Sequence, residues 1–156
     1  MLPSELSLAA KVELVFFDGE EAFENFTATD GLFGSRHFAQ SLGAEVKQFR
    51  GGILFDMIGD KSLTVSLSPD SPPDLTLRIF ASASALGQRA HFTFFQSEIT
   101  DDHTPLNAIG IPVIDLIDFD YPPWHTAGDT LDKLSAESLQ IVGQVALHAV
   151  AQTLAP

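Results

Sequence analysis

Short runs of β-branched and aromatic residues recur along the chain, and the segments between them are long enough to hold helices. Such runs are typical of strands. The expected strands cover residues 12–17, 51–59, 62–67, 91–95 and 111–117. The expected helices begin near Asp30, at Pro72 or Pro73, after Asp102 and at Ser135. This alternation predicts an α/β sandwich with a mixed, mainly parallel sheet flanked by helices.

The expected strands differ in their patterns of apolar residues. The runs at 12–17 and 51–59 are almost entirely apolar and predict buried strands. The run at 62–67 alternates hydroxyl and apolar side chains, which predicts a half-exposed strand at the edge of the sheet.

Composition restricts the classes of protein and of partner. The chain has 156 residues, 45% hydrophobic and 19% charged, which predicts one globular domain over residues 1–156. It contains no cysteine, so a metal would have to bind through Asp, Glu or His. Its formal net charge of -13 argues against a nucleic-acid partner. We expect neither a membrane span nor a signal peptide in this sequence.

Acidic residues follow several of the expected strands. Glu20 and Glu21 come after the first run, Asp56 lies near the end of the second, and Asp101 follows the fourth. Ligands of open α/β sheets bind beyond the carboxyl ends of the strands, so we expect these side chains to meet. His125, in the loop after the fifth run, completes a mixture of carboxylate and imidazole donors that zinc accepts. The pattern predicts a metal-assisted acid/base site.

Four stretches carry a resemblance to a known family. They are VELVFFDGEEAFENFTATDGLFGSRHFA (12–39), LFDMIGD (54–60), TDDHTPLNAIGIPVIDLI (100–117) and PPWHTAGDTLDKLSAESL (122–139). In this order they resemble the glutaminyl-peptide cyclotransferases, or glutaminyl cyclases, of the M28 zinc-peptidase superfamily. Much of the later half is also similar to bacterial M28 peptidases. The resemblance implies a zinc-exopeptidase-like three-layer fold and action on the N-terminal residue of a peptide.

The resemblance also implies roles for individual residues. Glu21 and His125 would bind zinc, Glu20 would be the general acid/base, and Asp101 would belong to a hydrogen-bonded carboxylate network. The substrate pocket would be walled by Trp124, Phe26 and Tyr121. One zinc ion is implied for a cyclase. In an aminopeptidase of the superfamily, Asp56 would instead bind a second zinc.

Family members carry a His-x-Asp motif upstream of the Glu-Glu pair, and this chain has none. We therefore expect the chain to be the C-terminal portion of an M28-like domain, truncated at the N-terminus, with the sheet edge beside residues 12–17 uncovered. A homodimer or a partner carrying the missing segment would cover that edge. A catalytically silent binding or assembly fragment is a third reading, in which zinc would bind weakly or be absent. The family resemblance implies a secreted or periplasmic location for a longer form.

Other polar residues in these stretches have simpler interpretations. Asp101 and Asp102 could cap the helix that follows them. We expect His103 to have a structural role at the start of that helix, and Asp115 and Asp118 to be turn and strand-end residues.

Overall fold

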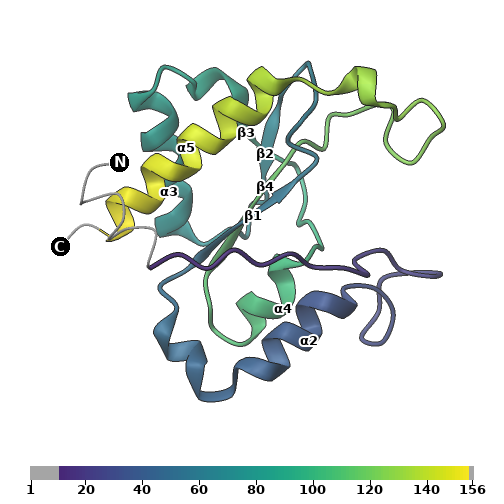
Figure 1. Cartoon of the computed structure of the whole chain (residues 1–156), viewed down its shortest axis with the longest axis vertical. Helices are drawn as coiled ribbons and strands as arrows, with labels where there is room; N and C mark the ends of the chain where they lie inside the picture. Colours follow the sequence, from purple (N-terminus) through teal and green to yellow (C-terminus); the bar gives the residue numbers. More distant parts are fainter. Residues whose placement is uncertain (1–10, 155–156) are drawn as a thin grey trace.

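The structure, a computed structural model, describes residues 11–154, which form one mixed four-stranded sheet with helices on both faces (Figure 1). The strands are β1 (Gly52–Asp56), β2 (Val65–Leu67), β3 (Phe92–Phe94) and β4 (Val113–Ile117). The α-helices are α2 (Phe33–Leu42), α3 (Pro73–Ala85), α4 (His103–Ala108) and α5 (Ala136–Leu154). Short 3-10 turns are η1 (Gly43–Gln48), η2 (Arg89–His91) and η3 (Leu131–Lys133). The predicted fold class is confirmed.

The strand order is β1-β4-β2-β3. The pairs β1–β4 and β2–β3 are parallel, and β2–β4 is antiparallel. Strand β2 therefore lies inside the sheet and is buried throughout, so the prediction of an edge strand at 62–67 was wrong. The alternating pattern misleads because Ser66, the hydroxyl residue of the pattern within β2, is buried together with its apolar neighbours Val65 and Leu67.

Helices α3 and α5 cover one face of the sheet, and α2 and α4 cover the other (Figure 1). Successive residues of β4 alternate between the two faces. Ile114 and Leu116 pack in the core beneath α3 and α5, whereas Val113 packs with residues of α2 and α4. Asp115 must therefore point toward the layer formed by α2 and α4.

The predicted helix starts agree with the structure. Pro73 is the first residue of α3, where its missing N–H costs no helix bond. The hydroxyl of Ser135 accepts a hydrogen bond from the backbone N–H of Ser138 at 3.2 Å, which is the geometry of a cap at the start of α5. None of the helices in the described part is long and apolar enough to cross a membrane.

Residues 12–17 form no strand in the structure, so the predicted buried strand there was wrong. They form irregular backbone that crosses in front of the sheet (Figure 1), and the side chains of Leu14 and Phe16 are 79% and 91% exposed. A strand requires a neighbour to satisfy its backbone groups, and no strand among residues 11–154 pairs with this segment. The run at 51–59 was expected to be buried, but strand β1 lies at an edge and Phe55 is exposed.

Candidate active site

The first turn of helix α2 fixes the backbone of the Glu-Glu segment. The N–H groups of residues 32, 33 and 34 donate to the carbonyl oxygens of residues 20, 19 and 18, at 2.7, 2.9 and 3.0 Å. The first N–H groups of a helix have no partner within the helix, so an adjacent stretch of chain can dock on them. Gly34 permits this close approach, because a Cβ atom there would lie 2.5 Å from the carbonyl oxygen of Asp18. The backbone from Asp18 to Glu20 is thus held against α2, and Glu21 follows directly.

The structure brings Glu21 and His125 together, although they are 104 positions apart in the sequence. Oε1 of Glu21 and Nε2 of His125 lie 2.9 Å apart, and both side chains are more than half exposed to solvent. The backbone of His125 has a φ of 53°, which is uncommon for a residue other than glycine. Its ring lies against that of Trp124, with the ring centroids 4.2 Å apart.

Carboxyl groups gather beside this pair. Burial, and after it the negative charges of Asp101 and Glu21 in that order, raise the pKa of Glu20 to about 7. Burial likewise raises the pKa of Asp101 to about 7, with a contribution from Asp56. Asp56 is the last residue of β1, and burial raises its pKa as well. Groups whose pKa values lie near neutrality can both accept and donate protons at physiological pH.

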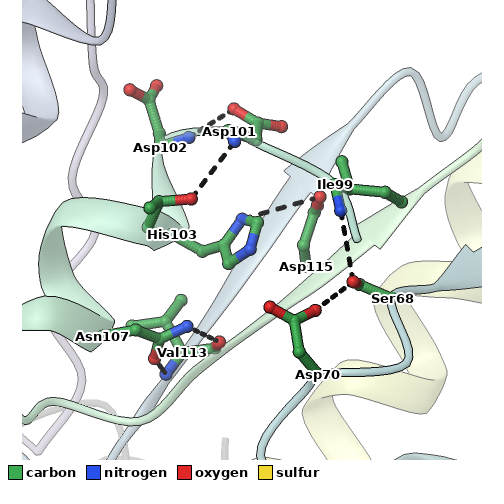
Figure 2. Close-up of polar contacts among 10 residues, drawn as sticks. Ser68, Asp70, Ile99, Asp101, Asp102, His103, Asn107, Val113 and Asp115 are labelled. Atoms are coloured by element: carbon green, nitrogen blue, oxygen red, sulfur yellow. Dashed lines mark hydrogen bonds and ion pairs between the residues drawn. The ribbon is translucent and has the colours of Figure 1, made fainter. Parts of the chain in front are cut away.

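Asp101 and Asp102 reach the cluster by a path that the sequence did not reveal. The parallel strands β1 and β4 have their carboxyl ends at the same rim of the sheet. Strand β3, which precedes Asp101 and Asp102, runs antiparallel to β4 and therefore ends at the opposite rim. Instead, the chain after β3 passes beside Ser68 and enters α4 (Figure 2). The buried carboxylate of Asp101 accepts a hydrogen bond from the backbone N–H of Asp102.

The simpler interpretations of these residues hold in part. Asp102 is the N-cap residue of α4, but its side chain makes no capping hydrogen bond. His103 is the first residue of that helix and is buried, as its predicted structural role requires. Asp118 directly follows β4, and its carboxylate accepts hydrogen bonds from the backbone N–H groups of Thr64 and Asp120, at 2.9 and 3.2 Å. Asp118 is therefore a structural strand-end residue, as expected.

Asp115 is the polar residue whose environment the sequence reasoning missed. It lies in the middle of β4 rather than at a turn or strand end, and only 1% of its surface is exposed. Burial raises its pKa to about 9, with Asp101 the largest contributor among its charged neighbours. The signal that could have found it is a single charge within the apolar run IPVIDLI, because a charge buried in a strand needs a compensating partner.

The predicted pocket residues lie in different surroundings. Phe26 lines an open, largely apolar groove of about 490 Å³ beside α2 and α4. Trp124 packs between His125 and Phe119, so it lies against the metal-ligand candidate. The hydroxyl of Tyr121 donates a hydrogen bond to Asp129 at 2.7 Å, which raises the pKa of the tyrosine to about 12.

The donor chemistry of the site fits zinc, but the number of donors is incomplete. Glu21 and His125 offer the oxygen and nitrogen atoms that zinc accepts. Within residues 11–154, however, no three His, Asp or Glu side chains are arranged to hold a metal ion. A catalytic zinc usually has three protein ligands. Among the described residues, Glu21 and His125 are therefore two candidate donors, one fewer than such a centre usually has.

Comparison with known proteins gives consistent matches. A family model described as peptidase family M28 matches residues 2–150. The glutaminyl-peptide cyclotransferase of Bothrops jararaca is 32% identical over 92% of this chain and 46% of its own length. The structure resembles that of the Acidobacteriales bacterium glutaminyl cyclase with a TM-score of 0.82 and 38% identity, over 88% of this chain and 51% of that one.

A Zn-dependent exopeptidase from Parabacteroides distasonis is also similar in structure. Its TM-score is 0.77 at 26% identity, over 87% of this chain and 52% of that chain. The chain spans about half the length of the curated relatives that it matches.

Proposed function

This chain belongs to peptidase family M28, and from that premise we propose that it forms part of a zinc-dependent centre acting on the N-terminal residue of peptides. The glutaminyl-peptide cyclotransferase reaction is the activity that we favour, because relatives with that name match most of the chain. In that reaction an N-terminal glutamine closes into pyroglutamate and ammonia is released.

The observation that carries this proposal is the meeting of Glu21 and His125 at 2.9 Å. These two residues would hold the zinc ion, and a bound zinc would polarise the side-chain carbonyl of the substrate. The further protein donor would come from outside the described residues, from a second copy of this chain or from a partner. The exposed side chains of Leu14 and Phe16 offer apolar surface for such a contact.

Glu20 would move the proton. Its pKa of about 7 lets it take a proton from the α-amino nitrogen as that nitrogen bonds to the side-chain carboxamide carbon. The same carboxyl group would return the proton to the amide nitrogen as the carbon–nitrogen bond breaks, so that ammonia leaves. Asp101 would share the charge that develops in this buried group of carboxylates.

An aminopeptidase is the second candidate. It is favoured by the similarity to a Zn-dependent exopeptidase and by the position of Asp56, whose charge acts on Glu20. In that case Glu20 would activate water, and Asp56 would help to hold a second zinc. If the two-donor site binds zinc only weakly, the chain would instead serve as a binding or assembly module.

Zinc binding is tested first, by calorimetric titration and by elemental analysis after dialysis. We expect Glu21→Gln and His125→Ala each to weaken zinc binding at least tenfold, since each removes one of two donors. His37→Ala is the matched control, because His37 is an exposed histidine on α2 that is not a member of this pair. Unchanged binding in both site variants would reject the proposed metal centre.

Activity is tested with zinc and a peptide that begins with glutamine. Release of ammonia and pyroglutamate, lost in Glu20→Gln, would support the cyclotransferase. Release of free amino acids with two zinc ions per site would support the aminopeptidase. Turnover that appears only after a protein partner or dimerisation completes the site would place the missing donor in that partner.

A further inference from the structure

The groove beside α2 and α4 has no role in the site described above. The two helices pack against each other on one face of the sheet (Figure 1). Ala39 and Gln40 line the groove from α2, and Pro105 and Ala108 line it from α4. Its volume of about 490 Å³ is within the range of clefts that bind small molecules and short peptide segments.

One end of the groove lies against the Glu-Glu segment. Leu32 lines the groove, and its backbone N–H donates to the carbonyl oxygen of Glu20 at 2.7 Å. Phe26 lines it as well. A Cβ atom on Gly31 would lie 2.6 Å from Cδ1 of Phe26 and 3.2 Å from the same carbonyl oxygen of Glu20. The groove therefore begins beside Glu20.

From this end the groove extends along both helices. Thr100, which directly precedes Asp101, lines the groove, and the lining continues to Ile109 just after α4. From Leu32 to Gln40 the groove follows α2 for about 12 Å, at about 1.5 Å per residue. An extended peptide advances about 3.3 Å per residue, so this length holds about three residues.

The walls of the groove combine apolar surface with spare hydrogen-bond donors. Leu32, Ala39 and Pro105 supply apolar surface. Arg36 also lines the groove, and its Nη2 donates to the carbonyl oxygen of Thr27. Among the described residues Arg36 has no acidic ion-pair partner, although the chain has a net charge of -13. A guanidinium has five N–H donors, so donors remain for an acceptor on a ligand. A peptide, which brings apolar side chains and carbonyl acceptors, fits these walls.

We propose that this groove binds the residues that follow the N-terminal residue of a peptide substrate, with an apolar second residue against Phe26 and Leu32 and a main-chain carbonyl oxygen on Arg36. The inference rests on the proposed function, because it extends that site along the peptide. A peptide whose first residue lies beside Glu20 must continue away from it, and the groove begins there. Phe26 would then contact the second residue, while Trp124 remains beside His125 at the first.

Binding is tested without turnover, by methyl NMR of the whole chain with zinc. The probes are pyroglutamyl-Leu-Gly-amide and pyroglutamyl-Gly-Gly-amide, which have no free α-amino group to react. We expect the methyl signals of Ala39, Ala108 and Ile109 to shift, and the leucine peptide to bind about tenfold more tightly because it adds an apolar side chain. Equal dissociation constants, or shifts that miss these methyls, would overturn the proposal. Groove signals that change with protein concentration alone would also overturn it, because a second copy would then cover the groove.

A matched pair of tryptophan variants locates the binding. Ala108 is exposed on α4, so Ala108→Trp places a large ring in the groove and should remove the preference for leucine. Ala81→Trp is the control, because Ala81 is equally exposed on α3, which covers the other face of the sheet. We expect the control to bind both peptides as the wild-type protein does. An undiminished preference in Ala108→Trp would refute the assignment to this groove.

Turnover separates this inference from the proposed function. We expect the KM for Gln-Leu-Gly-amide to be about tenfold lower than that for Gln-Gly-Gly-amide, with similar kcat values, because the groove contributes binding that does not change during the reaction. Turnover of both peptides with equal KM values would overturn the groove and leave the proposed function standing. If neither peptide is turned over but pyroglutamyl-Leu-Gly-amide still shifts the groove methyls, the proposed function fails and the groove remains a peptide-binding site.

Discussion

Replacing Gly34 with alanine tests whether helix α2 positions the Glu-Glu segment. An added Cβ would lie 2.5 Å from the carbonyl oxygen of Asp18 and 2.9 Å from its backbone nitrogen. Both neighbours are backbone atoms, so no side-chain rotation relieves the overlap. Residues 18–20 must move away from the first turn of α2, and the three hydrogen bonds between them weaken or break.

The expected cost follows from these three bonds. Each contributes about 1 kcal/mol net, so their loss lowers the free energy of unfolding by about 3 kcal/mol. Alanine is a better helix former than glycine and recovers at most about 1 kcal/mol. We therefore expect Gly34→Ala to destabilise the protein by about 2 kcal/mol. Glu21 should also move from His125, so zinc binding should weaken.

Urea denaturation without zinc measures the free energy of unfolding, and Gly143→Ala is the matched control. Gly143 lies in helix α5, is exposed, and has no atom within 4 Å of an added Cβ. That variant should gain up to about 1 kcal/mol, so the two variants should differ by about 3 kcal/mol. Equal stabilisation of both proteins, with unchanged zinc binding in Gly34→Ala, would refute this account of how the segment is held.

Three shorter predictions concern the rest of the molecule. Ser135→Ala removes the cap at the start of α5 and should cost about 1 kcal/mol, read as a lower Tm; an unchanged Tm would show that the cap contributes nothing. Phe16→Ser should change the free energy of unfolding by no more than about 0.5 kcal/mol, because the ring is exposed; a larger loss in urea would reveal a contact that covers it. Asp101 and Asp115 have raised pKa values, so their contribution to stability is fully present below about pH 4 and is lost as the pH rises through about 7 and about 9. The free energy of unfolding should therefore fall between pH 5 and pH 9, and stability that rises with pH over this window would contradict the burial of these carboxyls.

Local patterns in the sequence were sufficient for the fold class and for several element boundaries. The alternation of apolar runs with helix-length segments predicted the α/β architecture, and Pro73 and Ser135 marked the starts of α3 and α5. The motifs also led to Glu21 and His125, which the structure brings into contact. These features could be read from the sequence because a helix start depends on nearby residues, and because a motif keeps its spacing whatever surrounds it.

Only the tertiary structure decided which strands are neighbours and what each buried polar group faces. Residues 12–17 have the composition of a strand, yet they form none, because strand pairing depends on a partner that local pattern does not reveal. Strand β2, in contrast, has β4 on one side and β3 on the other, so it lies inside the sheet. Asp115 is the single acidic residue in an apolar run of the sequence. Its raised pKa depends on its burial and on carboxylates from other elements of the fold. Burial and electrostatic interaction are properties of distances between atoms, and the folded chain alone sets those distances.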